Sequence, residues 1–280
     1  MVAEPLHRER RNPGGPQGGE RTRDDPRPAP SPAPGPDVPA AQAPWTLMYH
    51  SVDTYRDDPY QVTVTPERFA RQMEWLRRSG LRGVALGELL RAHAAGRSAG
   101  LVGLTFDDGY ADLPREVLPV LERHGFTATA FVVVGRLGGH NVWDQGPRKP
   151  LMTRSQVRRL ADRGIEIGSH SGLHRPLTGL PAEELALETR QSREQLEDIV
   201  ERRVGGFCYP YGAVDAPAAA AVRDSGYSYA AAIEHSPLTG RWALPRSYVG
   251  ERDDGWRLRA KQVRHRLRGL RARSDEEGSR

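Results

Sequence analysis

The stretch Leu104-Thr105-Phe106-Asp107-Asp108-Gly109-Tyr110 joins a short apolar segment to two adjacent carboxylates. Residues 102–106 are mostly apolar and β-prone, which predicts a short buried strand. The glycine that follows permits a tight turn out of that strand. Neighbouring side chains at a strand end point in different directions, so one aspartate can hold a metal ion while the other takes a proton from water. Asp-Asp-Gly is also ordinary turn chemistry, and the rest of the chain has to decide between the two.

Strand-like and helix-like segments alternate around this stretch. Further strands are expected at 45–50, 83–86, 128–134, 165–168, 206–209, 227–233 and 244–246. Helices are expected from Thr65-Pro66 to Gly80 and at 116–124, 153–164, 181–202 and 217–224. Repeated strand–helix units imply parallel strands with right-handed crossovers. About seven units over roughly 210 residues fit a single β/α barrel better than an open sheet.

Polar side chains of the kinds used in catalysis fall at or just after the ends of the expected strands. They are His50, Asp107, Asp108, His170, Tyr211 and Arg246. In a β/α barrel the carboxyl ends of the strands form the rim where active sites are built. This coincidence favours a functional role for the aspartate pair over a simple turn.

The stretch Ser169-His170-Ser171-Gly172-Leu173-His174 holds two histidines four residues apart. Gly172 and Pro176 argue against a long helix, so this stretch is expected to form a loop or a single turn. Two histidines and one carboxylate form a three-ligand site typical of Zn²⁺, with positions open for water and substrate. The alternative is a pair of surface histidines in a turn.

The bulk composition restricts the possible partners. The chain has 280 residues and a formal net charge of +5. Residues 257–273 alone carry eight Lys or Arg and no acid, so the remainder is not a polycation. Basic residues are not interleaved with aromatic ones, which argues against nucleic-acid binding. Cys208 is the only cysteine, so no intrachain disulfide can form.

The two ends of the chain differ from its middle. Residues 1–44 contain eleven of the 23 prolines and no apolar face, which predicts a disordered tail, with a Pro-rich docking ligand as the alternative. A barrel is expected over 45–255. Residues 256–280 are expected to be a basic, solvated tail; the alternative is a basic amphipathic helix that makes weak contact with a membrane surface or an anionic polymer.

No segment has the features of a targeting or membrane-spanning sequence. No apolar run approaches the ~20 residues needed to cross a bilayer. The N-terminal arginines are not followed by an apolar stretch, so no signal peptide is recognised. A cytoplasmic location is expected, and an extracellular one only if an upstream start has been missed.

Three motifs together resemble those of a known family. TFDDGY at 105–110 and HSGLH at 170–174 resemble the first two motifs of the polysaccharide deacetylases, also called the NodB homology domain or carbohydrate esterase family 4. FCYPYG at 207–212 resembles the third motif. LMYHSV at 47–52 resembles the branch that includes poly-N-acetylglucosamine deacetylases. The resemblance covers residues 45–250.

The resemblance implies a distorted (β/α)₇ TIM-like barrel and assigns a role to each matching residue. Asp108, His170 and His174 would bind a divalent metal, usually zinc. Asp107 would be the general base, and Tyr211 would stabilise the oxyanion, largely through its backbone N–H. The implied enzyme is a hydrolase of non-peptide carbon–nitrogen bonds that removes N-acetyl groups from an N-acetylglucosamine-type sugar, expected in a polysaccharide.

Two features depart from the family pattern. Most members place a Leu-x-His motif near the end of the barrel, where Ile233-Glu234-His235 is only a faint match. Because the first and last strands of a closed barrel are neighbours, we expect His50 to supply the acid instead; the alternative is a structural histidine. The family often has an arginine at the position of Cys208, and Arg246 is expected to reach the base from a later strand; the alternative is a surface arginine.

The sequence leaves two other functions open. The substrate could be a small amino sugar or another amide made inside the cell. The barrel could also bind carbohydrate without catalysis, but the presence of both Asp107 and Asp108 argues against that version.

Overall fold

The structure is a computed structural model that describes residues 43–234 and 240–278, with the side chains of the last helix as far as Leu267. Most of the Pro-rich segment 1–44 and His235 lie outside the described residues, as does the faint Leu-x-His match at its last position. The boundaries expected after residues 44 and 255 stay predictions. None of the helices within the described ranges is both long and apolar enough to span a membrane.

Eight parallel strands form one curled sheet. They are β1 (Thr46–Tyr49), β4 (Arg82–Val84), β5 (Leu101–Phe106), β6 (Thr129–Val132), β7 (Glu166–Ser169), β8 (Gly206–Cys208), β9 (Tyr229–Ala231) and β10 (Ser247–Tyr248). The order in the sheet is β10-β1-β5-β6-β7-β8-β9, and β4 pairs with β5. Strands β2 (Ser51–Val52) and β3 (Thr63–Val64) form a separate parallel pair directly after His50.

One segment near the end of the chain contacts both edges of this sheet. Leu244 forms a parallel bridge with Ala231 of β9, and its backbone exchanges hydrogen bonds with residues 230 and 232. A few residues later, β10 pairs with Leu47 and Met48 of β1. The curl of the sheet is therefore completed through residues 244–248, which confirms the predicted α/β fold with a barrel-like parallel sheet.

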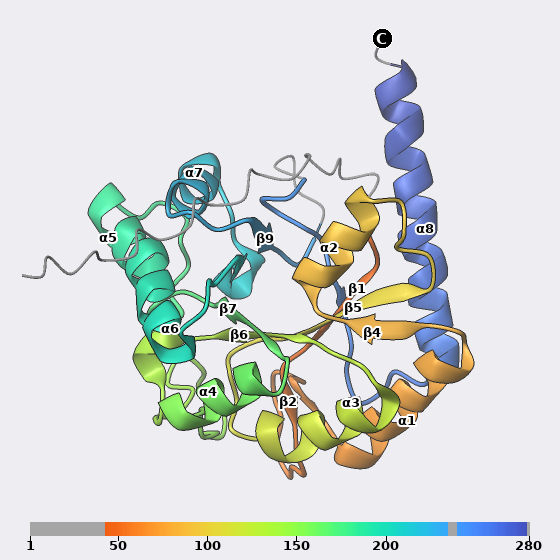
Figure 1. The fold of residues 1–280 in the computed structure, drawn as a ribbon, viewed down its shortest axis with the longest axis horizontal. Coiled ribbons are helices and arrows are strands. Elements are labelled where there is room, and N and C mark those ends of the chain that lie inside the picture. Colours follow the sequence, from red (N-terminus) through yellow and green to blue (C-terminus); the bar gives the residue numbers. More distant parts are fainter. Residues whose placement is uncertain (1–42, 235–239, 279–280) are drawn as a thin grey trace, which may run out of the picture. The chain divides into compact units, whose positions relative to one another are not determined.

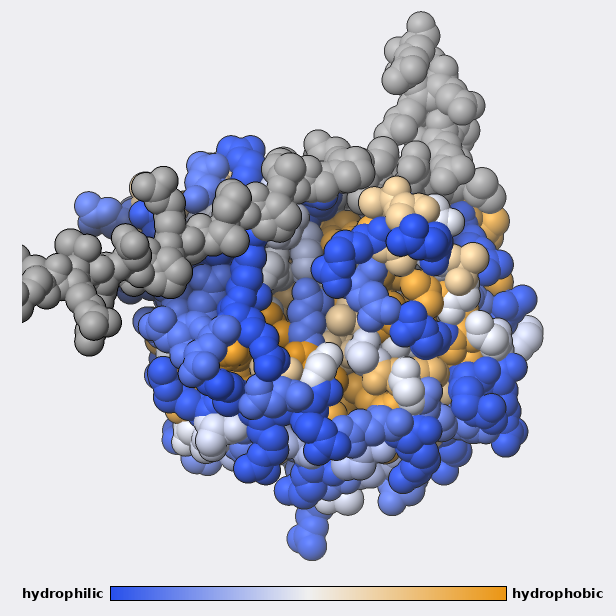
Figure 2. Space-filling view, viewed as in Figure 1, coloured by the Kyte–Doolittle hydropathy of each residue, from blue (hydrophilic) through white to orange (hydrophobic). Residues whose placement is uncertain are grey.

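Helices surround the sheet (Figure 1). They are α1 (Pro66–Arg78), α2 (Leu86–Ala94), η2 (Leu113–Val117), α3 (Leu118–His124), η3 (Val134–Arg136), α4 (Arg154–Asp162), α5 (Ala182–Ala186), η4 (Leu187–Gln191), α6 (Ser192–Val200), η5 (Pro210–Gly212), α7 (Ala216–Asp224) and α8 (Gly255–Gly278). On the face drawn in Figure 2, hydrophilic residues form most of the described surface, and apolar residues are visible mainly in its central part.

Local sequence signals explain where several helices begin. The Thr65 hydroxyl accepts a hydrogen bond from the backbone N–H of Arg68, and Pro66 occupies the first position of α1. Thr153 and Gln156 form both hydrogen bonds of a capping box at the start of α4. The apolar face of α1 then packs on the sheet, where Tyr49, Phe69 and Phe106 contact one another with ring centroids 5.3–5.8 Å apart.

The structure differs from the expected elements in three places. The prediction missed α2, because it assigned Leu86 to a strand although Leu86 and Leu89 are spaced as on a helix and are both buried. The helix expected over 181–202 is divided into α5, a single π-helical segment and α6. The strand expected at 244–246 is wrong, because Leu244 forms only an isolated bridge and the strand β10 lies at Ser247–Tyr248, where two residues are too few to show a pattern.

The basic segment after residue 255 is helical rather than a solvated flexible end. Leu258 is fully buried in the core, and Gln262 is also buried. The imidazole of His265 lies 2.9 Å from the carbonyl oxygen of Ala43, just before β1. The alternative of a helix is thus the correct one for 255–278, and its first half covers β1 and β10.

Candidate active site

Asp107 and Asp108 follow β5 directly and their side chains point to different partners. The Asp107 N–H donates to the carbonyl of Tyr49, so the first residue after β5 continues the strand pairing. Asp108 and Gly109 both have positive φ, 71° and 74°, which turns the chain sharply. Both carboxylates are buried. The turn therefore holds two acids at one place with separate surroundings.

Asp108 converges with the two histidines of the second motif. Its Oδ1 lies 3.3 Å from the Nε2 of His170 and 3.3 Å from the Nε2 of His174. All three side chains are at least nine-tenths buried. Burial by itself would raise the pKa of Asp108, but the two neighbouring imidazoles hold it well below its usual value. Burial lowers the pKa of His174.

The donor set fits a divalent cation. Nδ1 of His170 lies 2.8 Å from the carbonyl oxygen of Cys208, so Nδ1 carries a proton and Nε2 is the atom that could bind a cation. Two bonds of about 2.1 Å that meet at a tetrahedral angle place their ligand atoms roughly 3.4 Å apart. The separations of 3.3 Å match that value. The ligand atoms of the three residues all lie within 4.8 Å of one another.

The loop that carries the histidines is held by its own side chains. Ser171 and His174 have positive φ. The Ser171 hydroxyl accepts a hydrogen bond from the His174 N–H at 2.9 Å, and the buried carboxylate of Glu188 accepts one from the N–H of Leu173, also at 2.9 Å. As expected from Gly172, this stretch is a loop and not a long helix.

Asp107 forms a bidentate ion pair with Arg246. Its two carboxylate oxygens each lie 2.7 Å from a terminal nitrogen of the guanidinium. The remaining donors of Arg246 reach the carbonyl of Ala232, the hydroxyl of Thr105 and the sulfur of Cys208. All five donors of the buried guanidinium are thus used. Burial by itself would raise the pKa of Asp107, but the Arg246 charge lowers it below its usual value.

Cys208 lies beside this ion pair. Its sulfur is 3.0 Å from the guanidinium and 3.6 Å from the Asp107 carboxylate. Burial raises the pKa of the thiol. A small side chain at position 208 leaves space for the guanidinium of Arg246. This arginine belongs to the segment that closes the sheet.

The structure places His50 and Tyr211 at the same rim. His50 is half-buried, its Nδ1 has no hydrogen-bond partner among the described residues, and a charge on its ring would lower the pKa of both aspartates. Tyr211 has φ 59° and its ring centroid lies 4.8 Å from that of His174. Its side chain is exposed. All seven residues singled out from the sequence are therefore brought to one region; their chemical roles stay predictions.

Sequence reasoning missed two residues next to the three candidate ligands. The Trp143 ring stacks on His174, with centroids 4.2 Å apart and planes 21° from parallel. Asp144 is half-buried, and burial together with the charge of Asp108 raises its pKa. The one available signal was an isolated Trp-Asp pair in a Gly- and Pro-rich loop.

Backbone strain is concentrated in this region. Of the six non-glycine residues with positive φ among those the structure describes, four belong to the site: Asp108, Ser171, His174 and Tyr211. Left-handed backbone costs free energy for such residues and persists where the surroundings enforce it, which is common at functional sites.

The comparisons with known proteins agree with this geometry. The family model described as polysaccharide deacetylase matches residues 95–230. The Bacillus subtilis protein YxkH, which carries the family's name, is 28% identical over 208 residues, covering 72% of this chain and 70% of the relative. Residues 95–230, which hold the aspartate pair, the two histidines and Tyr211, belong to the polysaccharide deacetylase family. A hydrolase of non-peptide carbon–nitrogen bonds, as expected from the sequence, is thereby confirmed.

Further relatives of the chain have more specific names. The poly-β-1,6-N-acetyl-D-glucosamine N-deacetylase of Escherichia coli K12 is 25% identical over 236 residues, covering 67% of this chain. The match spans only 34% of that relative's length. Among solved structures, the Streptococcus pyogenes deacetylase PplD, in complex with acetate, superposes with a TM-score of 0.67 at 19% identity, covering 78% of this chain and 96% of that chain. That likeness supports the fold.

Proposed function

We propose that this polysaccharide deacetylase removes N-acetyl groups from an N-acetylglucosamine-type sugar within a polysaccharide, with zinc as its metal. The observation that carries the proposal is the convergence of Asp108, His170 and His174 beside a separate buried carboxylate, Asp107. The name of the Escherichia coli relative supports the choice of sugar.

Asp108, His170 and His174 would hold the divalent cation. When bound there, such an ion supplies Lewis acidity, which polarises the acetamide carbonyl and makes water a better nucleophile near neutral pH. Because His170 is oriented by the Cys208 carbonyl and His174 by Trp143, the two imidazoles are fixed before any ion arrives.

Asp107 would act as the general base. Arg246 keeps its carboxylate ionised and fixes its orientation. The carboxylate takes a proton from the attacking water as the new carbon–oxygen bond forms. A carboxylate held in this way does not have to rotate into position in the transition state.

Tyr211 and His50 would act on the two remaining groups that change in the reaction, the carbonyl oxygen and the sugar nitrogen. The backbone N–H of Tyr211 donates to the oxygen that becomes negative when water adds to the carbonyl. His50 gives a proton to the sugar nitrogen as the carbon–nitrogen bond breaks, so the products are acetate and a free amine. Tyr211 has a left-handed backbone, with φ 59° and ψ 5°, inside the short η5 segment.

The decisive experiment is an acetate-release assay with and without a chelator. We expect release from an N-acetylglucosamine oligomer, loss of release on chelation, and recovery on adding Zn²⁺. The Asp108→Asn variant should lose both bound metal and activity. His140→Ala removes an exposed histidine outside the ligand set and should change neither.

The same assay separates the remaining alternatives. Release from the monosaccharide but not from the oligomer would favour a small amino sugar as substrate. Binding of oligomers by a metal-loaded protein that releases no acetate would favour a carbohydrate-binding barrel and would contradict the proposal.

A further inference from the structure

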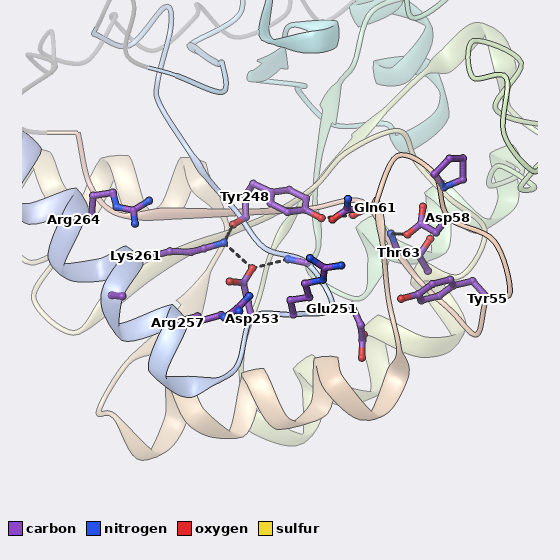
Figure 3. Close-up of a pocket in the computed structure, with 14 residues that line it drawn as sticks. Tyr55, Asp58, Gln61, Thr63, Tyr248, Glu251, Asp253, Arg257, Lys261 and Arg264 are labelled. Carbon is purple, nitrogen blue, oxygen red and sulfur yellow. Dashed lines mark hydrogen bonds and ion pairs between the residues drawn. The ribbon is translucent and has the colours of Figure 1, made fainter.

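A concave surface is formed by residues that follow β2 and β10, near the proposed site. It is a groove of about 790 Å³ between α8, residues 55–63 and residues 248–253. Figure 3 shows Arg257, Lys261 and Arg264 along one side of α8, with Tyr248 between this helix and Gln61. We call this surface the α8 groove.

The α8 groove is connected to the segment that carries His50. Thr63 lines the groove and accepts a hydrogen bond from Lys149 at 2.9 Å. The same ammonium group donates at 2.6 Å to the hydroxyl of Ser51, the residue after His50. Gly250 also lines the groove, two residues after Tyr248, and Tyr248 pairs with Met48, two residues before His50. A chain-like ligand in the groove would therefore lie near the position proposed for the acid.

The carboxylates that line the groove are already satisfied. Asp58 accepts hydrogen bonds from the N–H groups of residues 62 and 63. Glu251 accepts from the N–H and the hydroxyl of Thr65. Asp253 accepts from the N–H of Gly250 and from Lys261. Asp253 is therefore paired with a cation, and Glu251 lies 3.7 Å from Arg68, whereas Asp58 is bonded only by neutral donors and keeps its negative charge.

The cations are not balanced in the same way. Arg257, Lys261 and Arg264 follow i, i+4 and i+7 spacing, so they share one face of α8. No carboxylate among the described residues pairs with Arg257, with Arg264 or with the exposed Arg252. The α8 groove therefore presents three unpaired arginines against one carboxylate, Asp58, that has no cationic partner among the described residues.

The remaining lining suits a sugar. The Tyr248 hydroxyl donates to the carbonyl oxygen of Gln61, which fixes the ring across the groove. Tyr55 is 39% exposed and offers a second aromatic surface. Aromatic rings with polar neighbours are typical of sites that pack against the apolar faces of sugars.

We propose that the α8 groove binds carboxylate-bearing sugar units that flank the N-acetylated unit under attack. The planar guanidinium of arginine matches a carboxylate with two parallel hydrogen bonds. The concave shape favours a polymer chain over the flat surface of a bilayer. This inference rests on the proposed function, and it names an acidic N-acetylated glycan as the preferred substrate class over a neutral one.

The test compares two sets of oligosaccharides of equal length: neutral N-acetylglucosamine oligomers, and oligomers in which carboxylate-bearing units alternate with N-acetylglucosamine. Kinetic constants for acetate release are measured for the metal-loaded full chain. The groove variant is Arg257→Ala/Arg264→Ala. The comparison variant is Arg259→Ala/Arg266→Ala, which removes the same charge from the same helix outside the groove lining.

We expect the acidic oligomers to have the lower KM, and this preference to weaken as salt is added. The groove variant should raise KM for the acidic oligomers roughly tenfold, with kcat and the neutral substrates little changed, because each partly exposed ion pair contributes modestly. Arg257→Lys/Arg264→Lys should restore part of the preference. The comparison variant should behave as the parent chain does.

Three outcomes would overturn the inference. Equal KM values for acidic and neutral oligomers at low salt would refute it while leaving the proposed function intact. Equal losses in the groove and comparison variants would show that only the overall charge of α8 matters. Binding to vesicles with anionic lipid, in preference to acidic oligomers, would assign the surface to a membrane.

Absence of acetate release from every substrate would instead count against the proposed function. Titration of the acidic oligomer into the protein would still test the groove.

Discussion

Arg246 and Asp107 are 139 residues apart in sequence and form a buried bidentate pair. Because the folded-state pKa of Asp107 is below the usual value of 3.8, the pair stabilises the fold above that pH. This stabilisation is lost as pH falls through the lower folded-state pKa. At neutral pH the proposed base is therefore ionised and held in place.

We predict that Arg246→Gln moves the acidic limb of the kcat/KM profile to higher pH. Without the guanidinium, burial becomes the dominant influence and raises the pKa of Asp107. Removing one partner of a buried pair also destabilises the fold by about 3–5 kcal/mol, so unfolding is measured in parallel.

Arg246→Lys keeps the charge but loses the bidentate geometry, and it should retain the acidic limb nearer its original pH at reduced kcat. An acidic limb that does not move in a folded Arg246→Gln protein would show that the arginine does not act through Asp107.

We predict that His50→Ala lowers kcat by at least about a hundredfold, because a proton donor is lost. Metal content, measured by mass spectrometry, should stay unchanged, since His50 is not one of the three converging ligands. Turnover close to that of the parent chain would remove the acid assignment and leave His50 as a structural residue.

At the scale of elements, short sequence signals predicted a helix start correctly where side chains bond backbone groups a few residues away. The capping box of α4 is an example, since Thr153 and Gln156 satisfy each other's backbone groups. The loop at 169–174 could likewise be placed after a strand, because its signal is also local in the sequence. Its detailed shape depends on Glu188, which lies in the following helical segment.

We predict that Thr153→Ala lowers the free energy of unfolding by about 1 kcal/mol, measured by urea denaturation, because the exposed start of α4 loses its cap. Thr153→Ser keeps the hydroxyl and should lose only a small part of that. An unchanged midpoint in the alanine variant would mean that tertiary packing alone holds the start of α4.

At the scale of the whole molecule, the last segments of the chain close the sheet that the first strand begins. Residues 244–248 contact both β9 and β1, and α8 then packs over β10. Arg246 lies in this closing segment, so closure of the sheet and assembly of the base occur together.

We predict that Leu258→Ala destabilises the protein by about 3 kcal/mol, because it leaves a cavity where α8 enters the core. Leu267→Ala lies on the same helix but is 52% exposed, and it should change stability by less than about 0.5 kcal/mol. Similar small losses in both variants, measured by thermal and urea unfolding, would show that α8 does not contribute to the core.

Prediction from the sequence worked best where the signal is local. Residues 101–106 form a strand because apolar β-prone residues recur there, and the aspartate pair follows it as expected. It failed for α2 and β10, where the pattern was short or was assigned to the wrong period. Trp143 and Asp144 were missed because nothing near them in sequence signals a contact with His174.

The sequence by itself determined most of the alternation of strands and helices, the two acids after β5 and the paired histidines, because these depend on residues within a few positions of one another. Only the tertiary structure decided that Asp108 faces both imidazoles, that Arg246 is a buried partner of the base and not a surface arginine, and that α8 forms one wall of a groove. The physical reason is that these contacts join distant residues through the curl of the sheet, whose closure no local pattern specifies.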